Sequence, residues 1–593
     1  MCGIAGELAF DGDRADRDAV AAMTVAMADR GPDGEGAWCD GWVALGHRRL
    51  SVIDLTERGA QPMVDAELGL TVVFNGCIYN HHELRRELSA AHRFVSTSDT
   101  EVVLKAYAEW GDDFVDHLIG MFALVLVDQR RDRVVLARDR LGIKPLYLAD
   151  SRGRLRFASS LPALLAGGGI DTSIDDVALH HYLSWHSIVP APRTILRGVH
   201  KLPPATVRVV ERDGRSSERT YWHPPYVRDP ERDDWSPRDW EDAIGDALRL
   251  AVRRRLVADV PVGVLLSGGL DSSVLVALLA EEASGDVDTF SIGFREAGGE
   301  SGDEFEFSDA VADAFATRHH RRLVDADELV PAVLGAVDAM TEPMGSHDVP
   351  AFYLLAEWVA EHDKVVQSGQ GADEILAGYG YHQRLGDAGP DEAYTVFSRA
   401  FVDRPHAALT RVLEPEHLVP YDASGELLRS WMSGPLVETA LDAGLHADTH
   451  LLMPDDPVKR VDSMTMASGL EARVPFLDHE LVELAATCPP ELKLHDGGKG
   501  VLKALGRRVL PTEVVDRPKG YFPVPALRHL DGPVLDMVRE ALRAPEATAR
   551  GVFRGDYVDV LLAEPNREFS PGRANLLWQI GVLELWLQRH GVR

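Results

Sequence analysis

The stretch VPVGVLLSGGLDSSVLVALLAE, residues 260–281, decides the fold of the second half of this 593-residue chain. The apolar run that ends at Leu266 predicts a buried strand, and the apolar run after Asp271 predicts a helix. Gly268 and Gly269 lie in the loop between them. A strand, a glycine-rich loop and a helix can hold an anion, because backbone N–H groups and the positive end of the helix dipole converge there.

The residues that follow continue this alternation of strand and helix. The apolar patterns predict strands over 288–294, 321–326 and 364–369, and helices over 307–319, 327–340 and 351–361. Such alternation predicts an α/β domain with a parallel, doubly wound sheet and helices on both of its faces. The rest of the chain has mainly helical periodicity, so we expect a helical C-terminal part.

The beginning of the chain has a different pattern. It contains β-rich segments at 41–55, 70–80 and 121–139, the last of which predicts a hairpin around its polar centre DQRRDR. A helix is predicted over 98–118, with Ser98 and Glu101 in capping-box positions. This pattern predicts a layered α+β domain. A polar, proline-rich segment predicts a linker, which gives domains at 2–205 and 239–593 and a linker at 206–238.

Composition excludes several classes of protein. The net charge of -32 argues against a nucleic acid or an anionic membrane as partner. Four cysteines without a CxxC pair predict neither a disulfide framework nor a zinc site. The N-terminus has no signal-peptide pattern, and no apolar run reaches the roughly 20 residues of a membrane span. We expect a cytoplasmic protein.

Cys2 follows the initiator methionine in the segment MCGIAG. One interpretation is a small buried core cysteine. The other is a nucleophile, exposed when Met1 is removed because the next side chain is small. The freed α-amine titrates near pH 8 and can act as the general base for the thiol.

The loop SGGLDSS, residues 267–273, is neither a Walker motif nor a GxGxxG loop, because no lysine follows its second glycine and its glycine spacing differs. It resembles the pyrophosphate loop of enzymes that cleave ATP between the α and β phosphates to form an acyl-adenylate. In that interpretation Asp271 is a Mg²⁺ ligand, and Ser267 and Ser272 donate to phosphate oxygens.

Ordered motifs along nearly the whole chain resemble the glutamine-hydrolysing asparagine synthetases and their relatives. They are MCGIAG, RGPDGEG, HRRLSVIDL, FNGCIYN, SDTEVVLKAY, LARDRLGIKPLY, SGGLDSS, SGQGADEILAGY and EARVPFLD. The resemblance implies a class II glutamine amidotransferase domain with the N-terminal-nucleophile (Ntn) fold, followed by an ATP-pyrophosphatase synthetase domain. Together they would form a glutamine-dependent carbon–nitrogen ligase.

The resemblance assigns the glutaminase residues as follows. Cys2 is the nucleophile, Arg49 binds the glutamine α-carboxylate in bidentate geometry, and Asp99 binds the α-amine. The Asn75 amide and the Gly76 N–H stabilise the oxyanion. The structural alternatives are a surface arginine for Arg49, a helix-start aspartate for Asp99 and an Asn-Gly hairpin turn for residues 75–76. Two further glutamine-binding positions are Leu50 and Cys77.

The resemblance also assigns the synthetase residues. Leu266 and Ile292 flank the adenosine, and Gln370 lies beside the acyl-adenylate. Asp373 joins Asp271 in binding Mg²⁺, and Lys503 neutralises the departing pyrophosphate. Arg473 and Asp478 are expected to be structural. The remaining ATP-binding positions are Ser267, Gly268, Gly269, Ser272, Ser368 and Gly369.

The implied reaction needs glutamine, ATP with Mg²⁺, and an acceptor carboxylate. Cys2 forms a thioester with glutamine and releases ammonia, which converts an acyl-adenylate into an amide. Because free ammonia is protonated in water and acyl-adenylates hydrolyse, we expect an internal ammonia tunnel. A homodimer is compatible with the resemblance, but no residue pattern specifies it.

Two positions depart from the asparagine synthetases. Their NGE motif is Asn75-Gly76-Cys77 here, and their SGEG motif is SGQG, with Gln370 in place of a possible general base. The segment 341–355 also lacks their Thr/Ser-rich aspartate loop. FNGCIYN, GDEFEFSD, SHD and QSGQGADE resemble bacterial N-acetylglutaminylglutamine amidotransferases, which make an osmoprotectant.

Four functions therefore remain open. The preferred acceptor is N-acetylglutaminylglutamine, and the alternative acceptor is aspartate, as in asparagine synthesis. A non-catalytic relative is disfavoured by the intact Cys2, Arg49, Asn75, SGGLDSS loop and Lys503. A β-lactam- or lasso-type cyclase is disfavoured because such relatives usually lack the N-terminal cysteine.

Overall fold

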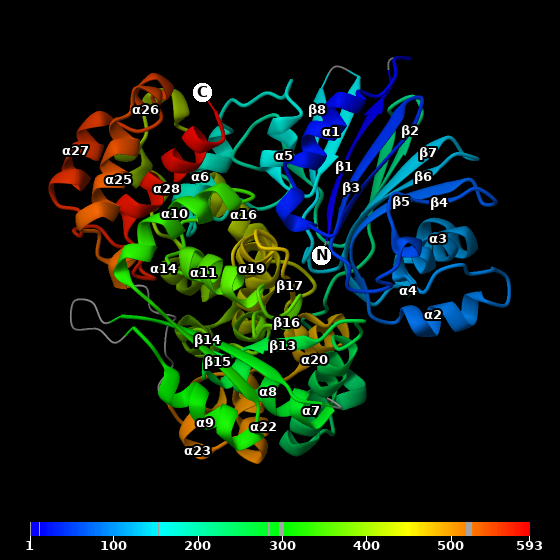
Figure 1. Cartoon of the computed structure of the whole chain (residues 1–593). Helices are drawn as coiled ribbons and strands as arrows, with labels where there is room; N and C mark the ends of the chain where they lie inside the picture. Colours follow the sequence, from blue (N-terminus) through cyan, green and yellow to red (C-terminus); the bar gives the residue numbers. More distant parts are fainter. Residues whose placement is uncertain are drawn as a thin grey trace.

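The computed structural model describes residues 2–10, 12–151, 153–282, 285–295, 302–517 and 525–592. The chain folds into two units that lie against each other (Figure 1). The first contains two antiparallel sheets, and the second is built around one parallel sheet. No helix of the described ranges combines the length and apolarity that crossing a membrane requires.

The first unit contains two six-stranded antiparallel sheets. In order across the first sheet lie β10 (His200–Lys201), β8 (Tyr147–Ser151), β9 (Arg154–Ala158), β1 (Gly3–Ala9), β3 (Val43–Arg49) and β2 (Gly34–Asp40). In order across the second lie β12 (Ser216–Thr220), β11 (Thr206–Glu211), β7 (Arg133–Arg138), β6 (Gly120–Asp128), β5 (Leu70–Ile78) and β4 (Met63–Asp65). The β6–β7 hairpin confirms the prediction around DQRRDR.

Strand alternation gives each sheet two apolar faces. Ile4 and Leu8 of β1 pack against Val73 of β5 and its neighbours, which form the core between the sheets. Helices α1 (Arg17–Val25) and α5 (Leu161–Ala166) cover the outer face of the first sheet, and α3 (Asp99–Trp110) covers that of the second. The layered α+β prediction is confirmed.

Two local predictions in this unit are wrong. Residues 206–220 are not part of a linker, because β11 pairs with β7 and with β12 and extends the second sheet. The polar residues of β12 are exposed, which made an edge strand look like a linker in the sequence. Ser98 does cap α3, but Glu101 accepts from Val95 N and Ser96 N instead of closing a capping box.

The second unit contains a five-stranded parallel sheet. In order across it lie β15 (Arg318–Val324), β14 (Asp288–Phe294), β13 (Val262–Leu265), β16 (Val365–Gln367) and β17 (Glu471–Arg473). The chain runs outward from β13 in one direction and then in the other from β16. The strand order therefore reverses between β13 and β16, and ligands bind at such switch points in open α/β sheets.

Helices cover both faces of this sheet. One layer consists of α7 (Pro237–Arg254), α8 (Leu270–Glu282), α9 (Phe305–Phe315) and α22 (Gly500–Val509), and the other of α10 (Leu329–Ala339), α11 (Val349–Val359) and α19 (Pro457–Met466). Helix α9 ends before the predicted residue 319, because Ala316 adopts a left-handed conformation. Beyond β17, every regular element of the described chain is a helix.

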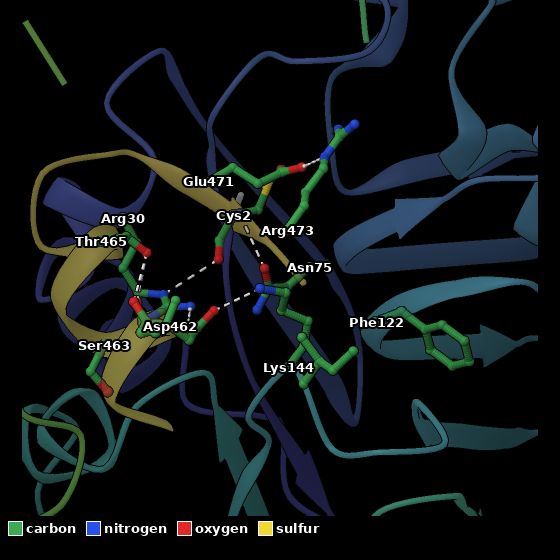
Figure 2. A network of polar contacts seen from close by, with 12 residues as sticks. Cys2, Arg30, Asn75, Phe122, Lys144, Asp462, Ser463, Thr465, Glu471 and Arg473 are labelled. Carbon is green, nitrogen blue, oxygen red and sulfur yellow. Dashed lines mark hydrogen bonds and ion pairs between the residues drawn. The ribbon is translucent and has the colours of Figure 1, made fainter. Parts of the chain in front are cut away.

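Three buried carboxylates of the second unit bind cations of the first. Asp462 on α19 lies between Lys144 and Arg30, at 2.8 and 3.0 Å (Figure 2). Glu342 accepts from Lys201 at 2.9 Å and from Tyr147 Oη at 3.1 Å. Although burial opposes ionisation, Lys144 and Arg30 lower the pKa of Asp462 to about 2. A third carboxylate, that of Asp455, also pairs with Lys201.

We predict that Asp462→Ala lowers the free energy of unfolding by about 3–5 kcal/mol, because two buried cations lose their partner. Thermal and denaturant midpoints of the full chain measure the loss. Asp246→Ala is the control, because Asp246 is 82% exposed beside Arg249 and its removal should leave both midpoints unchanged. Equal midpoints for the two variants would contradict the structural role of Asp462.

Candidate active sites

The first candidate site lies where Cys2 meets strand β5. Cys2 immediately precedes β1 and is buried, with 7% of its surface exposed. Its backbone N donates to Asn75 Oδ1 at 3.1 Å (Figure 2). Asn75 and Gly76 lie inside β5, opposite Ala123 and Phe122 of β6, so the hairpin-turn interpretation of this pair is wrong. Met1 lies outside the described residues.

Asn75 can donate a hydrogen bond near Cys2, and the backbone at Gly76 leaves no room for a side chain. Among the described residues, the buried Asn75 Nδ2 has no hydrogen-bond partner. An added Cβ on Gly76 would lie 2.2 Å from the carbonyl oxygen of Met121, so only glycine fits. Burial raises the pKa of the Cys2 thiol, so its reaction with an electrophile requires a base.

Arg49, Leu50, Cys77 and Asp99 line the same pocket as Cys2. Arg49 ends β3, where it donates to the carbonyl oxygens of Thr56, at 2.9 Å, and of Asp54. Asp99 begins α3, and its Oδ2 accepts from Ile78 N at 3.0 Å. Burial, with a smaller contribution from the charge of Glu471, raises the pKa of Asp99 to about 6.

Two residues of β17 in the second unit complete this pocket: Glu471 and Arg473. Figure 2 shows Glu471 beside Cys2, with a dashed line that joins it to Arg473. Arg473 is fully buried and donates to the carbonyl oxygens of Arg255 and Val257, which agrees with its expected structural role. Sequence reasoning missed Glu471, because nothing in EARVPFLD indicates that this strand reaches the N-terminal pocket.

The second candidate site is a cavity at the switch point of the parallel sheet. The loop after β13 and the loop after β16 meet there, so Asp271 and Ser272 lie beside Ser368 and Gly369. Gly268 has a φ of 70°, and an added Cβ would lie 2.7 Å from Ser308 N. The close approach of α9 therefore requires glycine. The predicted positions that line this cavity are Leu266, Ser267, Asp271, Ser272, Ile292, Ser368, Gly369, Gln370 and Asp373.

Lys499 is the lysine that meets the carboxylates of this cavity. Its Nζ lies 2.7 Å from Asp271 Oδ2 and 2.8 Å from Asp373 Oδ1. Lys503, on the next helical turn, donates to the carbonyl oxygen of Asp496, and its expected contact with pyrophosphate stays a prediction. A signal was present in the sequence. Lys499 stands between two glycines before α22, where the helix dipole disfavours a cation unless anions compensate.

Asp271 and Asp373 are suitable ligands for a magnesium ion. Both carboxylates line the cavity, and Lys499 holds them next to each other. Mg²⁺ in phosphate-binding sites usually takes one or two carboxylates and completes its coordination with phosphate oxygens and water. No cluster of three or more potential metal ligands occurs in the described parts of the chain, so the fit depends on oxygens that a nucleotide would supply.

Gln370 lies in this cavity together with two carboxylates that sequence reasoning missed, those of Asp348 and Glu374. Tyr379 Oη donates to Glu374 Oε1 at 2.6 Å. Burial, reinforced by the charge of Asp373, raises the pKa of Glu374 to about 7. Asp348 lies 3.1 Å from Arg460. Both acids stand in motifs that carry the resemblance, SHD and SGQGADEILAGY, but the motifs alone assigned no role to either carboxylate.

Family models match both units. Residues 1–222 match a glutamine amidotransferase domain, and residues 243–588 match asparagine synthase. The match of the first model beyond residue 205 agrees with the strands β11 and β12 seen in the structure.

Curated relatives cover most of the chain. The glutamine-hydrolyzing asparagine synthetase 3 of Bacillus subtilis is 32% identical over 548 residues, which are 88% of this chain and 87% of that protein. Asparagine synthetase 1 of the same organism is 29% identical over 99% of this chain and 96% of its own. The amidase chyE of Penicillium rubens is 30% identical over 83% of each chain.

We predict that Asn75→Ala slows glutamine hydrolysis about 100- to 1000-fold in kcat, because it removes an oxyanion donor. Glutamate release at saturating glutamine measures the loss. Asn80→Ala is the matched control and should keep the parental rate, since Asn80 does not line the pocket and its side chain bonds only the backbone of His117 and Ile119. A rate within a few-fold of the parent in Asn75→Ala would exclude Asn75 from the oxyanion site.

Proposed function

The chain belongs to the asparagine synthase family, and on this premise we propose that it uses ammonia from glutamine to amidate a carboxylate that ATP has activated as an adenylate. One observation carries the proposal. A single chain holds a buried cysteine at its N-terminus, bonded to Asn75, and an SGGLDSS loop at the switch point of a parallel sheet. The first group suits amide hydrolysis, and the second suits nucleotide binding.

At the first site, the Cys2 thiol attacks the side-chain carbonyl of glutamine. The buried thiol needs a base, and the α-amine that removal of Met1 would free can take its proton. Asn75 Nδ2 and the Gly76 N–H can donate to the oxyanion that forms. The proton taken from the thiol passes to the amide nitrogen, which leaves as ammonia. Water then cleaves the thioester to give glutamate and the free thiol.

At the second site, the loop 267–272 and Ser368-Gly369 would hold ATP, with Leu266 and Ile292 against the adenosine. An acceptor carboxylate attacks the α-phosphorus, and pyrophosphate leaves. Asp271 and Asp373 would hold Mg²⁺, which supplies charge neutralisation of the phosphates when it is bound. Lys499 keeps the two carboxylates in place.

Ammonia has to pass between the two sites without meeting bulk water. Free ammonia would be protonated, and the adenylate would hydrolyse if water entered. The buried interface between the units, with Asp462 bonded to Arg30 and Arg30 in turn donating to the carbonyl oxygen of Cys2 at 3.5 Å, supports an internal route. We therefore propose that ammonia crosses this interface.

For the acceptor we favour a carboxylate without a free ammonium group, and N-acetylglutaminylglutamine in particular. Gln370 stands beside the expected adenylate and is neutral, so this position offers no negative charge to balance an ammonium group of the acceptor. The specific alternative is aspartate, supported by the names of the two Bacillus relatives.

The decisive experiment supplies the purified enzyme with ATP, Mg²⁺, glutamine and a panel of carboxylates, and measures pyrophosphate and AMP. We expect kcat/KM for N-acetylglutaminylglutamine to exceed that for aspartate by about 100-fold, because the ammonium group of aspartate would be buried without a partner. Cys2→Ala should amidate with ammonia but not with glutamine. Equal or better use of aspartate would establish the alternative, and release of ADP and phosphate would contradict adenylation.

We predict that Lys499→Ala lowers pyrophosphate release at least 100-fold, because Asp271 and Asp373 then repel each other and lose their positions. Lys503→Ala, one helical turn further along, is the matched comparison and should lower the rate less than Lys499→Ala does. Glutamate release without ATP should persist in both variants. A greater loss in Lys503→Ala than in Lys499→Ala would reverse the assignment.

A further inference from the structure

The glutamine pocket contains a carboxylate from the opposite unit. Glu471 of β17 is 1% exposed and lines the pocket together with Cys2 and Asp99. Its charge raises the pKa of both the Cys2 thiol and Asp99, in each case after the larger effect of burial, so it lies close enough to act on both groups. In Figure 2 the Glu471 side chain lies next to Cys2.

Glutamine carries an α-carboxylate and an α-ammonium, and both charges need partners in a buried pocket. In the NGE motif of the asparagine synthetases, a glutamate stands at the position of Cys77 in this chain. Burial raises the pKa of the Cys77 thiol, so Cys77 is neutral and cannot balance an ammonium. Asp99 alone is poorly suited, because burial raises its pKa to about 6 and so disfavours its charged form.

Arg473 holds Glu471 ionised and in position. Its Nε donates to Glu471 Oε1 at 2.7 Å, and its Nη1 donates to the carbonyl oxygens of Arg255 and Val257, at 2.8 Å each. Its Nη2 lies 3.6 Å from the sulfur of Cys77. Because backbone carbonyls anchor Arg473, its guanidinium keeps a fixed place, and the carboxylate bound to it does as well.

We propose that Glu471 binds the α-ammonium of glutamine together with Asp99, replacing the carboxylate lost at Cys77. The inference rests on the proposed glutaminase function of Cys2. Glu471 is then a specificity residue for the amino group of the substrate, and Arg473 is its positioning residue. Arg49, which lines the same pocket, would serve the α-carboxylate.

The paired strands β16 and β17 connect the two sites. Ser368 N donates to the carbonyl oxygen of Arg473 at 2.8 Å, and Ser368 belongs to the nucleotide cavity. β17 therefore contacts the glutamine pocket through its side chains and the second cavity through its backbone. The synthetase unit, by contributing Glu471, completes the substrate site of the glutaminase unit.

The test compares glutamine with glutaramate, which is glutamine without its α-amino group, as substrates of the full-length enzyme and of Glu471→Gln. Wild type should prefer glutamine strongly in kcat/KM. In Glu471→Gln this preference should fall about 10- to 100-fold, chiefly through a higher KM for glutamine, while hydrolysis of glutaramate changes little. A merely structural role would lower both activities together and leave their ratio unchanged.

Glu480→Gln is the matched control, because Glu480 follows in the same segment but pairs with Arg254 outside the pocket. It should keep the wild-type ratio. If Glu471→Gln does not fold, Glu471→Asp serves instead. The shorter aspartate side chain can keep its pair with Arg473 but lies farther from the ammonium group. The ratio of kcat/KM for glutamine to that for glutaramate should then fall at least threefold. An unchanged ratio in the folded variant overturns the inference.

The proposed function fails separately from this inference. If the wild-type enzyme hydrolyses no glutamine, and neither ATP nor any acceptor activates hydrolysis, the glutaminase assignment itself is refuted. Hydrolysis of glutamine by wild type with an unchanged ratio in the variant would refute only the role of Glu471.

Discussion

The pairing of buried charges across the interface is the constraint on which the arrangement of this molecule depends. Lys144 and Arg30 belong to the first unit, and Asp462, which binds both, belongs to the second. Neither unit could bury these groups alone, because an unpaired charge in a dry interior costs several kcal/mol. The interface therefore fixes how the two units sit against each other, and with that the position of β17 in the pocket of Cys2.

Both sites lie where strands end or meet, which gives each reacting group a rigid support. Cys2 and Asn75 are held by β1 and β5, from different sheets of the first unit, and Asp271 follows β13. The pairing of β16 and β17 then places the loop at Ser368 next to the strand that carries Glu471. Positioning on strands suits chemistry that tolerates little displacement of the reacting atoms.

Charge balance separates the roles of the acidic residues. Asp271 and Asp373 share Lys499, and Asp348 binds Arg460, so each of these carboxylates is paired with a cation. Asp99 and Glu374 have raised pKa values because burial dominates their surroundings. Carboxyl groups with perturbed pKa values are common in binding sites, where the charge of a substrate can neutralise theirs. The replacements at Cys77 and Gln370 alter that balance at one position in each site.

The sequence alone determined the alternation that predicts the parallel sheet, the hairpin at DQRRDR, and the pairing of an N-terminal cysteine with an SGGLDSS loop, because local periodicity and loop chemistry are written in adjacent residues. It missed β11 and β12, because their polar edge resembles a linker, and it gave no role to Lys499, which pairs with Asp271. Only the tertiary structure decided that Glu471 enters the pocket of Cys2. The two residues are far apart in the chain, and their proximity comes from the packing of two units, which no local pattern encodes.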